Sequence, residues 1–203
     1  MRRRRGPAAA DDDDAAVIES SWREPERFAV LFDRHAPHIY RYLARRAGRQ
    51  VADDLVAETF LAAFAKRDRY DLGYADARPW LYGIATNLVG QHRRDQARQD
   101  RITQAAAAAE PEVPGHADRV AADVTAQAMR TLLEGALAVL SAGDRDVLLL
   151  IAWEQLTYQE VSRALAIPVG TVQSRLHRAR TKVRQVLAGT DAGATYKELT
   201  TNE

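Results

Sequence analysis

The segment 170–187 carries five cationic side chains and no acidic one. Guanidinium and ammonium groups bind the phosphate oxygens of nucleic acids, and an arginine also binds the edge of a base. The composition of this segment therefore predicts contact with nucleic acid. The five cations are Arg175, Arg178, Arg180, Lys182 and Arg184.

The same segment reads as an amphipathic helix. At about 100° per residue its apolar residues fall on one stripe and its polar residues fall opposite. A helix that buries this stripe can lay its polar face in the major groove of DNA, with its first turns at base edges and later turns at phosphates. An ordinary helix with a solvated cationic face is the alternative. The stripe is Val172, Leu176, Ala179 and Val183, and the opposite face is Ser174, His177, Arg178 and Thr181.

A second group, at residues 66–79, interleaves cations with aromatic rings and includes Arg69, Tyr70 and Tyr74. Where proteins bind single-stranded nucleic acid, bases stack on such rings while arginines follow the phosphates. This loop is therefore a candidate single-strand surface. The alternative is that its rings pack inside the protein.

The helical pattern after this loop starts at Trp80 and runs out through Arg93 and Arg94. Trp80 falls in register with Ile84, so we expect it to be partly buried. Tyr74 falls in no apolar register, and both a packing role and a stacking role stay open for it.

The sequence lacks the patterns of common catalytic and metal sites. It has no glycine-rich phosphate loop, nucleophile elbow or HExxH motif, and it has no cysteine. His35 and His38 form the one close histidine pair, but Pro37 lies between them and no third ligand is evident. We therefore predict no catalytic activity, no cofactor and no bound metal.

Two helical patterns hinged at Pro168 predict a helix-turn-helix that would position the cationic segment. Thr157 and Glu160 have the spacing of a capping box at the start of the first helix. Proline cannot continue that helix, and Gly170 tolerates a turn before a second helix begins at Thr171.

Apolar residues recur at intervals of three and four along most of the chain, which predicts an all-α fold of two small helical domains joined by a flexible linker. One helix of the first domain is expected to open at Asp53 and Asp54. In the second, a four-helix domain, one helix is expected to be capped at Ser141 with Asp144. The predicted boundaries are a disordered tail at 1–24, a domain at 25–98, the linker at 99–125, a domain at 126–188 and a disordered tail at 189–203.

The 203 residues are 46% hydrophobic and carry a net charge of +1. That net charge is low for a nucleic-acid binder, but the segments 28–100 and 132–188 carry twelve basic groups against nine acidic and seven against five. The excess predicts two separate basic modules. No apolar run approaches the roughly 20 residues of a membrane-spanning helix, and the first residues do not read as a secretion signal. We expect no membrane insertion and a cytoplasmic location.

Two blocks in this order carry a family resemblance. Residues 53–64 read DDLVAETFLAAF, residues 80–87 read WLYGIATN, and the helix-turn-helix block spans 148–187. They resemble regions 2.2, 2.3 to 2.4 and 4 of the bacterial sigma-70 family of RNA polymerase sigma factors, in its compact extracytoplasmic-function (ECF) group. The resemblance implies a subunit that binds core RNA polymerase and directs promoter recognition, DNA melting and transcription initiation.

The resemblance also implies roles for residues of the first block. Region 2.2 of the family docks on the clamp helices of the polymerase largest subunit, a role that would fall to Asp53, Asp54, Glu58 and Thr59. The following loop and helix of the family open the minus-ten element and hold a flipped base of the melted strand. That role would fall to Arg69, Tyr70, Tyr74, Trp80, Asn87, Arg93 and Arg94.

Region 4 of the family reads the minus-thirty-five element as duplex DNA. Base reading would fall to Gln173, Ser174, His177 and Arg178, with Thr171 at the start of the same helix. Contacts nearer the phosphates would fall to Arg175, Arg180 and Lys182.

One rival hypothesis is a stand-alone helix-turn-helix regulator whose N-terminal helices dimerise or sense a ligand. Such a regulator would bind duplex DNA tightly alone, usually at a two-fold site, whereas a sigma factor should bind weakly until core polymerase joins. An α-helical enzyme is a second rival, and it lacks any catalytic motif. An anti-sigma factor that covers the chain until a signal arrives is a further hypothesis, implied only by the resemblance.

Overall fold

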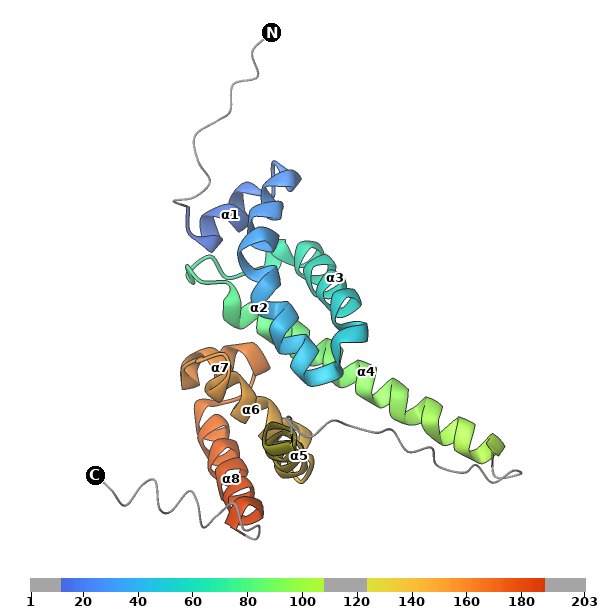
Figure 1. Cartoon of the computed structure of the whole chain (residues 1–203). Coiled ribbons are helices and arrows are strands. Elements are labelled where there is room, and N and C mark those ends of the chain that lie inside the picture. The colour runs from blue at the N-terminus through green and yellow to red at the C-terminus, as the bar shows by residue number, and fades with distance from the viewer. Residues whose placement is uncertain (1–11, 108–123, 189–203) are drawn as a thin grey trace. The chain divides into compact units, whose positions relative to one another are not determined.

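The computed structural model describes residues 12–107 and 124–188, and every regular element in these two ranges is a helix (Figure 1). This confirms the predicted all-α fold. The α-helices are α1 (Asp14–Ser20), α2 (Ala29–Ala47), α3 (Arg49–Ala65), α4 (Arg78–Ala107), α5 (Val124–Ala138), α6 (Ala142–Ala152), α7 (Tyr158–Leu165) and α8 (Val169–Ala188). Two short 3-10 helices, η1 (Pro25–Phe28) and η2 (Arg67–Arg69), complete the set. No helix in these ranges is both long and apolar enough to cross a bilayer.

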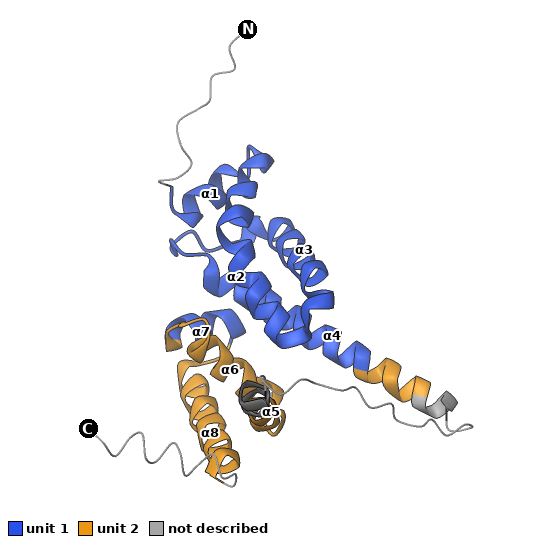
Figure 2. Cartoon of the chain, viewed as in Figure 1, with its two compact units in different colours: residues 1–96, 159–166 blue, residues 97–158, 167–203 orange. Residues whose placement is uncertain are grey.

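The chain divides into two compact units (Figure 2). Unit 1 comprises residues 1–96 and 159–166, and unit 2 comprises residues 97–158 and 167–203. This division differs from the predicted domain boundaries. The prediction places both helices of the helix-turn-helix, α7 and α8, in one domain, whereas most of α7 groups with unit 1. Gly83 of α4 gives a physical reason, since a Cβ atom there would collide with the backbone carbonyl of Ala164 in α7.

The core of unit 1 is built around the hairpin of α2 and α3, which turns at Gly48. Gly48 has φ +90°, a conformation that favours glycine. The Tyr42 hydroxyl of α2 lies 2.7 Å from the Thr86 hydroxyl of α4. The rings of Tyr42 and Tyr82 pack edge to face, with their centres 5.3 Å apart. Helix α4 is thereby fixed against the hairpin, which positions the loop before it.

The prediction of a disordered tail over 1–24 is wrong for its second half. Helix α1 begins after Asp13, whose carboxylate accepts a hydrogen bond from the N–H of Ala16 at 2.8 Å. Val17 and Ile18 are fully buried. Capping and burial of two branched apolar side chains stabilise a helix that seven residues alone would not hold. Residues 1–11 lie outside the described part.

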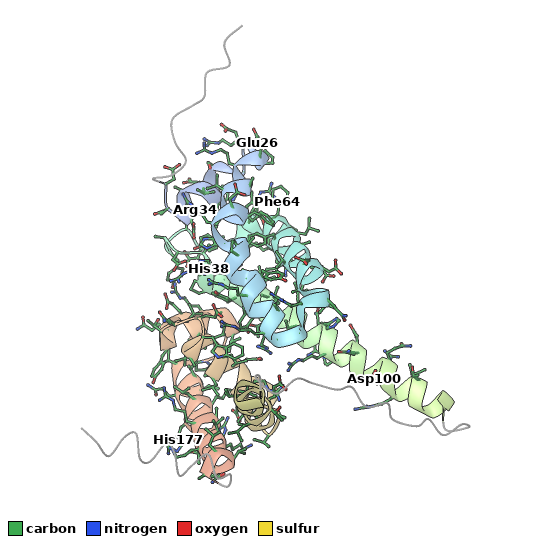
Figure 3. The ribbon with its side chains drawn as sticks, in the orientation of Figure 1. Glu26, Arg34, His38, Phe64, Asp100 and His177 are labelled. Carbon is green, nitrogen blue, oxygen red and sulfur yellow. The ribbon has the colours of Figure 1, made fainter. Side chains whose placement is uncertain are left out.

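Both ends of the predicted linker, 99–125, are helical, because α4 continues to Ala107 and α5 begins at Val124. Residues 99–107 read QDRITQAAA, which are mostly good helix formers without glycine or proline. Asp100 lies in these later turns of α4 (Figure 3). The rest of the predicted linker, residues 108–123, and the predicted tail at 189–203 lie outside the described residues.

In unit 2, α6 begins at the predicted cap, where the N–H of Asp144 donates to the Ser141 hydroxyl at 3.2 Å. Helix α8 begins at Val169, two residues before the predicted start. Gly170 therefore lies in the first turn of α8, and the left-handed turn residue is Ala166, with φ +51°. The core of unit 2 includes Val147 and Leu150.

Candidate nucleic-acid interface

Helix α8 buries most of the predicted apolar stripe and exposes most of the predicted polar face, while Val183 and Thr181 are half-buried. Val172, Leu176 and Ala179 are at most 2% exposed. Four residues expected to read bases are exposed, namely Gln173, Ser174, His177 and Arg178. Figure 3 labels His177 on this helix. Arg180 and Lys182 are exposed as well, whereas Thr171 and Arg175 are half-buried.

Arg178 is anchored by a carboxylate that the sequence analysis treated only as part of a helix cap. Its Nη2 atom donates to Oδ1 of Asp144 at 3.0 Å. The Asp144 side chain is 5% exposed and that of Arg178 is 53% exposed. Burial by itself raises the pKa of Asp144, but hydrogen bonds with Arg178 and Ser141 lower that pKa below its ordinary value. Asp144 is therefore charged at neutral pH and holds the arginine from beneath.

Arg175 lies differently from the other cations of α8. Its guanidinium packs so closely over Gly143 of α6 that a Cβ atom on Gly143 would collide with it. The Arg175 side chain therefore packs against α6 and is only partly open to solvent.

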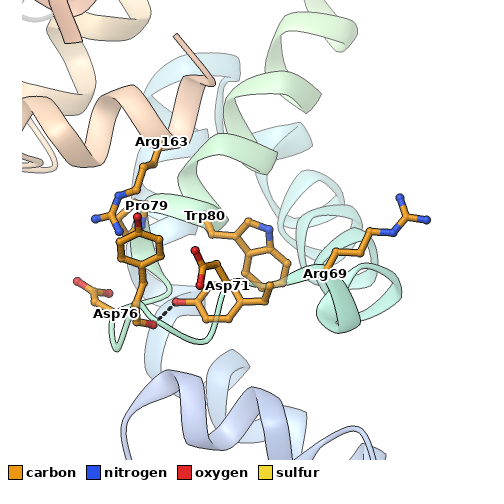
Figure 4. Close-up of a pocket in the computed structure, with 8 residues that line it drawn as sticks. Arg69, Asp71, Asp76, Pro79, Trp80 and Arg163 are labelled. Atoms are coloured by element: carbon orange, nitrogen blue, oxygen red, sulfur yellow. Dashed lines mark hydrogen bonds between the residues drawn. The ribbon is translucent and has the colours of Figure 1, made fainter. Parts of the chain in front are cut away.

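In unit 1, a pocket of about 370 Å³ lies beside residues 67–77, which we call the tyrosine loop (Figure 4). It contains Arg69 and the aromatic residues singled out by the sequence, together with two carboxylates and one arginine, Arg163, that the sequence analysis did not single out. Its lining is Arg69, Tyr70, Asp71, Tyr74, Asp76, Pro79, Trp80 and Arg163.

The three rings of the pocket have different exposures. Tyr70 is 8% exposed, its ring lies 5.0 Å from that of Trp80, and its hydroxyl donates to the carbonyl of Tyr74 at 2.6 Å (Figure 4). The Tyr70 hydroxyl is protonated at neutral pH, and burial raises its pKa further above the ordinary value. Trp80 is half-buried, as predicted from its register. Tyr70 therefore forms a wall of the pocket and has little free face for stacking.

Tyr74 is the exposed ring, at 43%. The guanidinium carbon of Arg163 lies 3.7 Å from the centre of this ring, which is cation–π distance. The guanidinium thus covers one face of the Tyr74 ring, and the exposed part of the ring lies next to a cation. That pairing suits stacking with a base beside its phosphate.

The remaining predicted DNA contacts of unit 1 lie on the loop and on α4. Arg69, Asn87 and Arg94 are exposed. Arg93 is half-buried, and its Nη2 atom donates to the carbonyl of Arg46 in the last turn of α2 at 2.6 Å. A cation there also complements the helix dipole. Arg93 therefore has a structural role that spacing alone did not reveal.

The four residues expected at the polymerase interface do not all face outward. Asp53, Asp54 and Glu58 are exposed on α3. Thr59 is fully buried, and its hydroxyl donates to the carbonyl of Leu55 at 2.6 Å. This corrects the prediction for Thr59, because the buried stripe of α3 includes that position.

A further buried cluster went unnoticed in the sequence because one of its members lies in a run of aspartates. Asp14 is 6% exposed, and its carboxylate lies 2.7 Å from Nε2 of His35 and 3.1 Å from Nη1 of Arg34. His38, the other member of the histidine pair, faces Arg41 at 2.7 Å. Val17 and Ile18, the branched apolar residues that follow the aspartate run, were the signal in the sequence that this segment folds.

Two family models match the chain. The model described as Sigma-70 region 2 matches residues 31–99, and the model described as Sigma-70, region 4 matches residues 130–183. Together they cover more than half of the sequence. Asp14 and the rest of α1 lie outside both matches.

Several curated proteins resemble the chain over most of its length. It is 33% identical over 176 residues to the ECF RNA polymerase sigma factor SigE of Mycolicibacterium smegmatis, covering 83% of this chain and 62% of that protein. It is 33% identical over 171 residues to the RNA polymerase sigma factor CarQ of Myxococcus xanthus, covering 80% and 90%. The ECF sigma factor SigW of Bacillus subtilis is 28% identical over 171 residues, covering 81% and 90%.

Two solved structures share the fold at 23% sequence identity. One is CnrH in complex with the cytosolic domain of CnrY, with a TM-score of 0.63 over 89% of this chain and 100% of that one. The other is the sigma factor RpoE of Bartonella quintana in complex with the anti-sigma factor NepR, with a TM-score of 0.58 over 79% and 96%.

Proposed function

The chain belongs to the sigma-70 family as an ECF RNA polymerase sigma factor, a subunit that directs transcription initiation, and from this premise we propose how its residues divide the work. Helix α8 reads the minus-thirty-five element as duplex, the tyrosine loop and α4 bind the melted minus-ten strand, and the acidic face of α3 binds the clamp helices of core polymerase. The chain acts in the cytoplasm, without catalysis or a cofactor of its own.

The observation that carries this proposal is the exposed, acid-free face of α8 opposite a stripe in which Val172, Leu176 and Ala179 are buried. Major-groove recognition needs such a helix, with side chains free to meet base edges and a rigid base beneath. Asp144 supports the arrangement, because it holds Arg178 by an ion pair while leaving half of that side chain exposed.

The tyrosine-loop pocket supports the second part of the proposal. Extruding a base from a duplex costs a few kcal/mol, which stacking and phosphate contacts can offset. Tyr74 and Trp80 supply rings, and Arg69 supplies a cation. Because Asp71 lines the same pocket, we expect it to favour a base with an exocyclic amino group (adenine, cytosine or guanine), from which a carboxylate can accept a hydrogen bond. Replacing that base by hypoxanthine or uracil in a forked promoter should weaken binding.

Run-off transcription tests the function directly. The purified chain, added to core RNA polymerase on a genomic promoter library, should start transcription at a defined set of promoters. The stand-alone regulator makes the opposite prediction, since it would bind a palindromic duplex tightly without polymerase. Tight palindromic binding together with failed reconstitution would reject the sigma-factor assignment of these surfaces.

We also propose an anti-sigma partner for this chain, because each of the two solved structures described above contains a second chain, which in one of them is the anti-sigma factor NepR. Phe32 and Leu61, on α2 and α3, are 45% and 68% exposed and offer apolar contacts. Purification of the tagged chain from its native cells should recover this partner. Recovery of core polymerase alone, across growth conditions, would count against it.

A further inference from the structure

The N-terminal segment 12–22 is bonded to both ends of the tyrosine loop. At the beginning of the loop, Nε1 of Trp22 donates to the carbonyl of Arg67 at 3.2 Å. At its end, the N–H of Asp14 donates to the carbonyl of Ala75 at 3.0 Å, and the N–H of Ala77 donates to Oδ2 of Asp14 at 2.9 Å. The loop is therefore fastened by a segment that the region 2 match, residues 31–99, does not include.

Asp14 is itself held firmly. Oδ2 also lies 2.7 Å from Nε2 of His35, and Oδ1 accepts from Nη1 of Arg34 at 3.1 Å, so α2 fixes both oxygens. Burial alone raises the pKa of Asp14, but the hydrogen bonds from His35, Ala77 and Arg34 bring that pKa below its ordinary value. The group is thus a buried carboxylate, bonded to the backbone at the end of the loop and to two cation-forming side chains of α2.

Asp14 is bonded to the backbone beside the exposed ring of the pocket, since Ala75 directly follows Tyr74. After burial, the charge of Asp14 is the next largest cause that raises the pKa of Tyr70. The protonated Tyr70 hydroxyl donates to the carbonyl of Tyr74. Moving Asp14 would therefore disturb the backbone at Ala75 and the neighbouring residue Tyr74 together.

We propose that Asp14 is a positioning residue for promoter melting, which holds the tyrosine loop in the shape that receives unpaired bases without touching DNA itself. This inference rests on the proposed function of that loop. A loop that is already ordered before binding loses less conformational entropy when a strand binds. Loosening Asp14 should therefore weaken binding of the melted strand selectively, and binding of the upstream duplex by α8 should not change.

The test uses holoenzyme reconstituted from core polymerase and the full chain, on a promoter found by run-off transcription. Fluorescence anisotropy measures affinity for two DNAs, a fork with an unpaired minus-ten strand and a duplex that carries only the minus-thirty-five element. Asp14→Asn should lower fork affinity on the order of tenfold, the loss expected for about one charge-assisted hydrogen bond. Duplex affinity should change by less than about twofold, since α8 belongs to the other unit.

Three companion variants make the result specific. Asp12→Asn removes the same charge from an exposed neighbour that pairs with Arg27 at 3.2 Å, and it should change neither affinity. Trp22→Phe keeps an aromatic ring but removes the bond to Arg67, and it should lower fork affinity about threefold. Tyr74→Ala reports whether the loop binds the strand at all.

The outcomes separate this inference from the function on which it rests. Loss of fork affinity in Tyr74→Ala with normal affinity in Asp14→Asn and Trp22→Phe would overturn the positioning role and keep the loop as the strand site. Normal fork affinity in Asp14→Asn, Trp22→Phe and Tyr74→Ala would overturn both the positioning role of Asp14 and the role of the loop as the strand site. Equal loss on fork and duplex in Asp14→Asn would show a general folding defect and reject the selective role. If Asp14→Asn melts below the assay temperature, Trp22→Phe decides by the same criterion.

Discussion

Arg178 combines a buried anchor with an exposed head, and this geometry suits base reading better than a freely mobile cation does. Its ion pair with Asp144 fixes the guanidinium orientation, which limits the side-chain entropy lost when it meets a base. Lys182, by contrast, is exposed nearer the C-terminal end of α8 and carries a compact charge that suits phosphate.

We therefore expect the two cations to differ when replaced by alanine. Arg178→Ala should cost about 1–3 kcal/mol of promoter binding and relax the preference at one upstream position, whereas Lys182→Ala should weaken binding on all sequences and flatten the salt dependence. Binding of holoenzyme to a panel of single-base promoter variants at several salt concentrations measures both effects. Because Arg178→Ala also strands the Asp144 carboxylate, Asp144→Asn is the matched control for lost stability. Identical effects of the two alanine variants would mean that α8 lies in the groove in another orientation.

Asp14 makes the stability of unit 1 sensitive to acid. Its pKa lies below the ordinary value of 3.8 in the folded chain, so its contribution to stability is fully present above that value and is lost as pH falls through the lowered pKa. Between neutral pH and about pH 3, Asp14→Asn should therefore lose less stability than the parent chain, although it starts lower. Urea unfolding at pH 7, 5, 4 and 3, followed by circular dichroism, measures the two slopes. Parallel slopes would show that Asp14 contributes nothing to the acid sensitivity.

Among the helices, those with a strong local pattern could be predicted and those held by distant contacts could not. The apolar stripe of α8 and the Ser141 cap of α6 are visible in a short window of sequence. Helix α1 is not, because its decisive partner Ala77 lies 63 positions away and its own aspartate run suggests disorder. For the same reason, the sequence indicated which face of α8 is exposed but not that Asp144 would anchor Arg178.

Helix α3 presents its acidic face to solvent, and this face is expected to contact the polymerase. The double variant Asp53→Asn with Asp54→Asn should weaken binding to core polymerase about two- to tenfold, with the larger loss at low salt, because charges at an interface rim mainly steer association. Asp33→Asn, an exposed acid on α2, should have no such effect. Competition against a labelled parent chain for limiting core polymerase measures the ratio. Unchanged competition at low salt would place the polymerase contact on another face.

At the scale of the whole molecule, the even charge balance conceals two basic blocks, one in each predicted DNA-binding module. A single basic body would bind one stretch of duplex, and its affinity would not depend on a second site. Two modules on one chain would read two elements, and their joint affinity would depend on whether both can be engaged at once. Core polymerase, by binding the chain, would set the separation at which that happens.

The spacing between the two promoter elements should therefore control transcription. Inserting five base pairs rotates one element by about half a turn relative to the other, since B-DNA has roughly 10–10.5 base pairs per turn. Holoenzyme should then engage the elements only one at a time, and run-off transcription should fall to near background. Inserting one base pair rotates the element by only about a tenth of a turn and should be far less damaging. As a control, the holoenzyme should bind the isolated upstream duplex and the isolated fork with unchanged affinity. Transcription that tolerates the five-base-pair insertion would mean that only one of the two units reads the promoter.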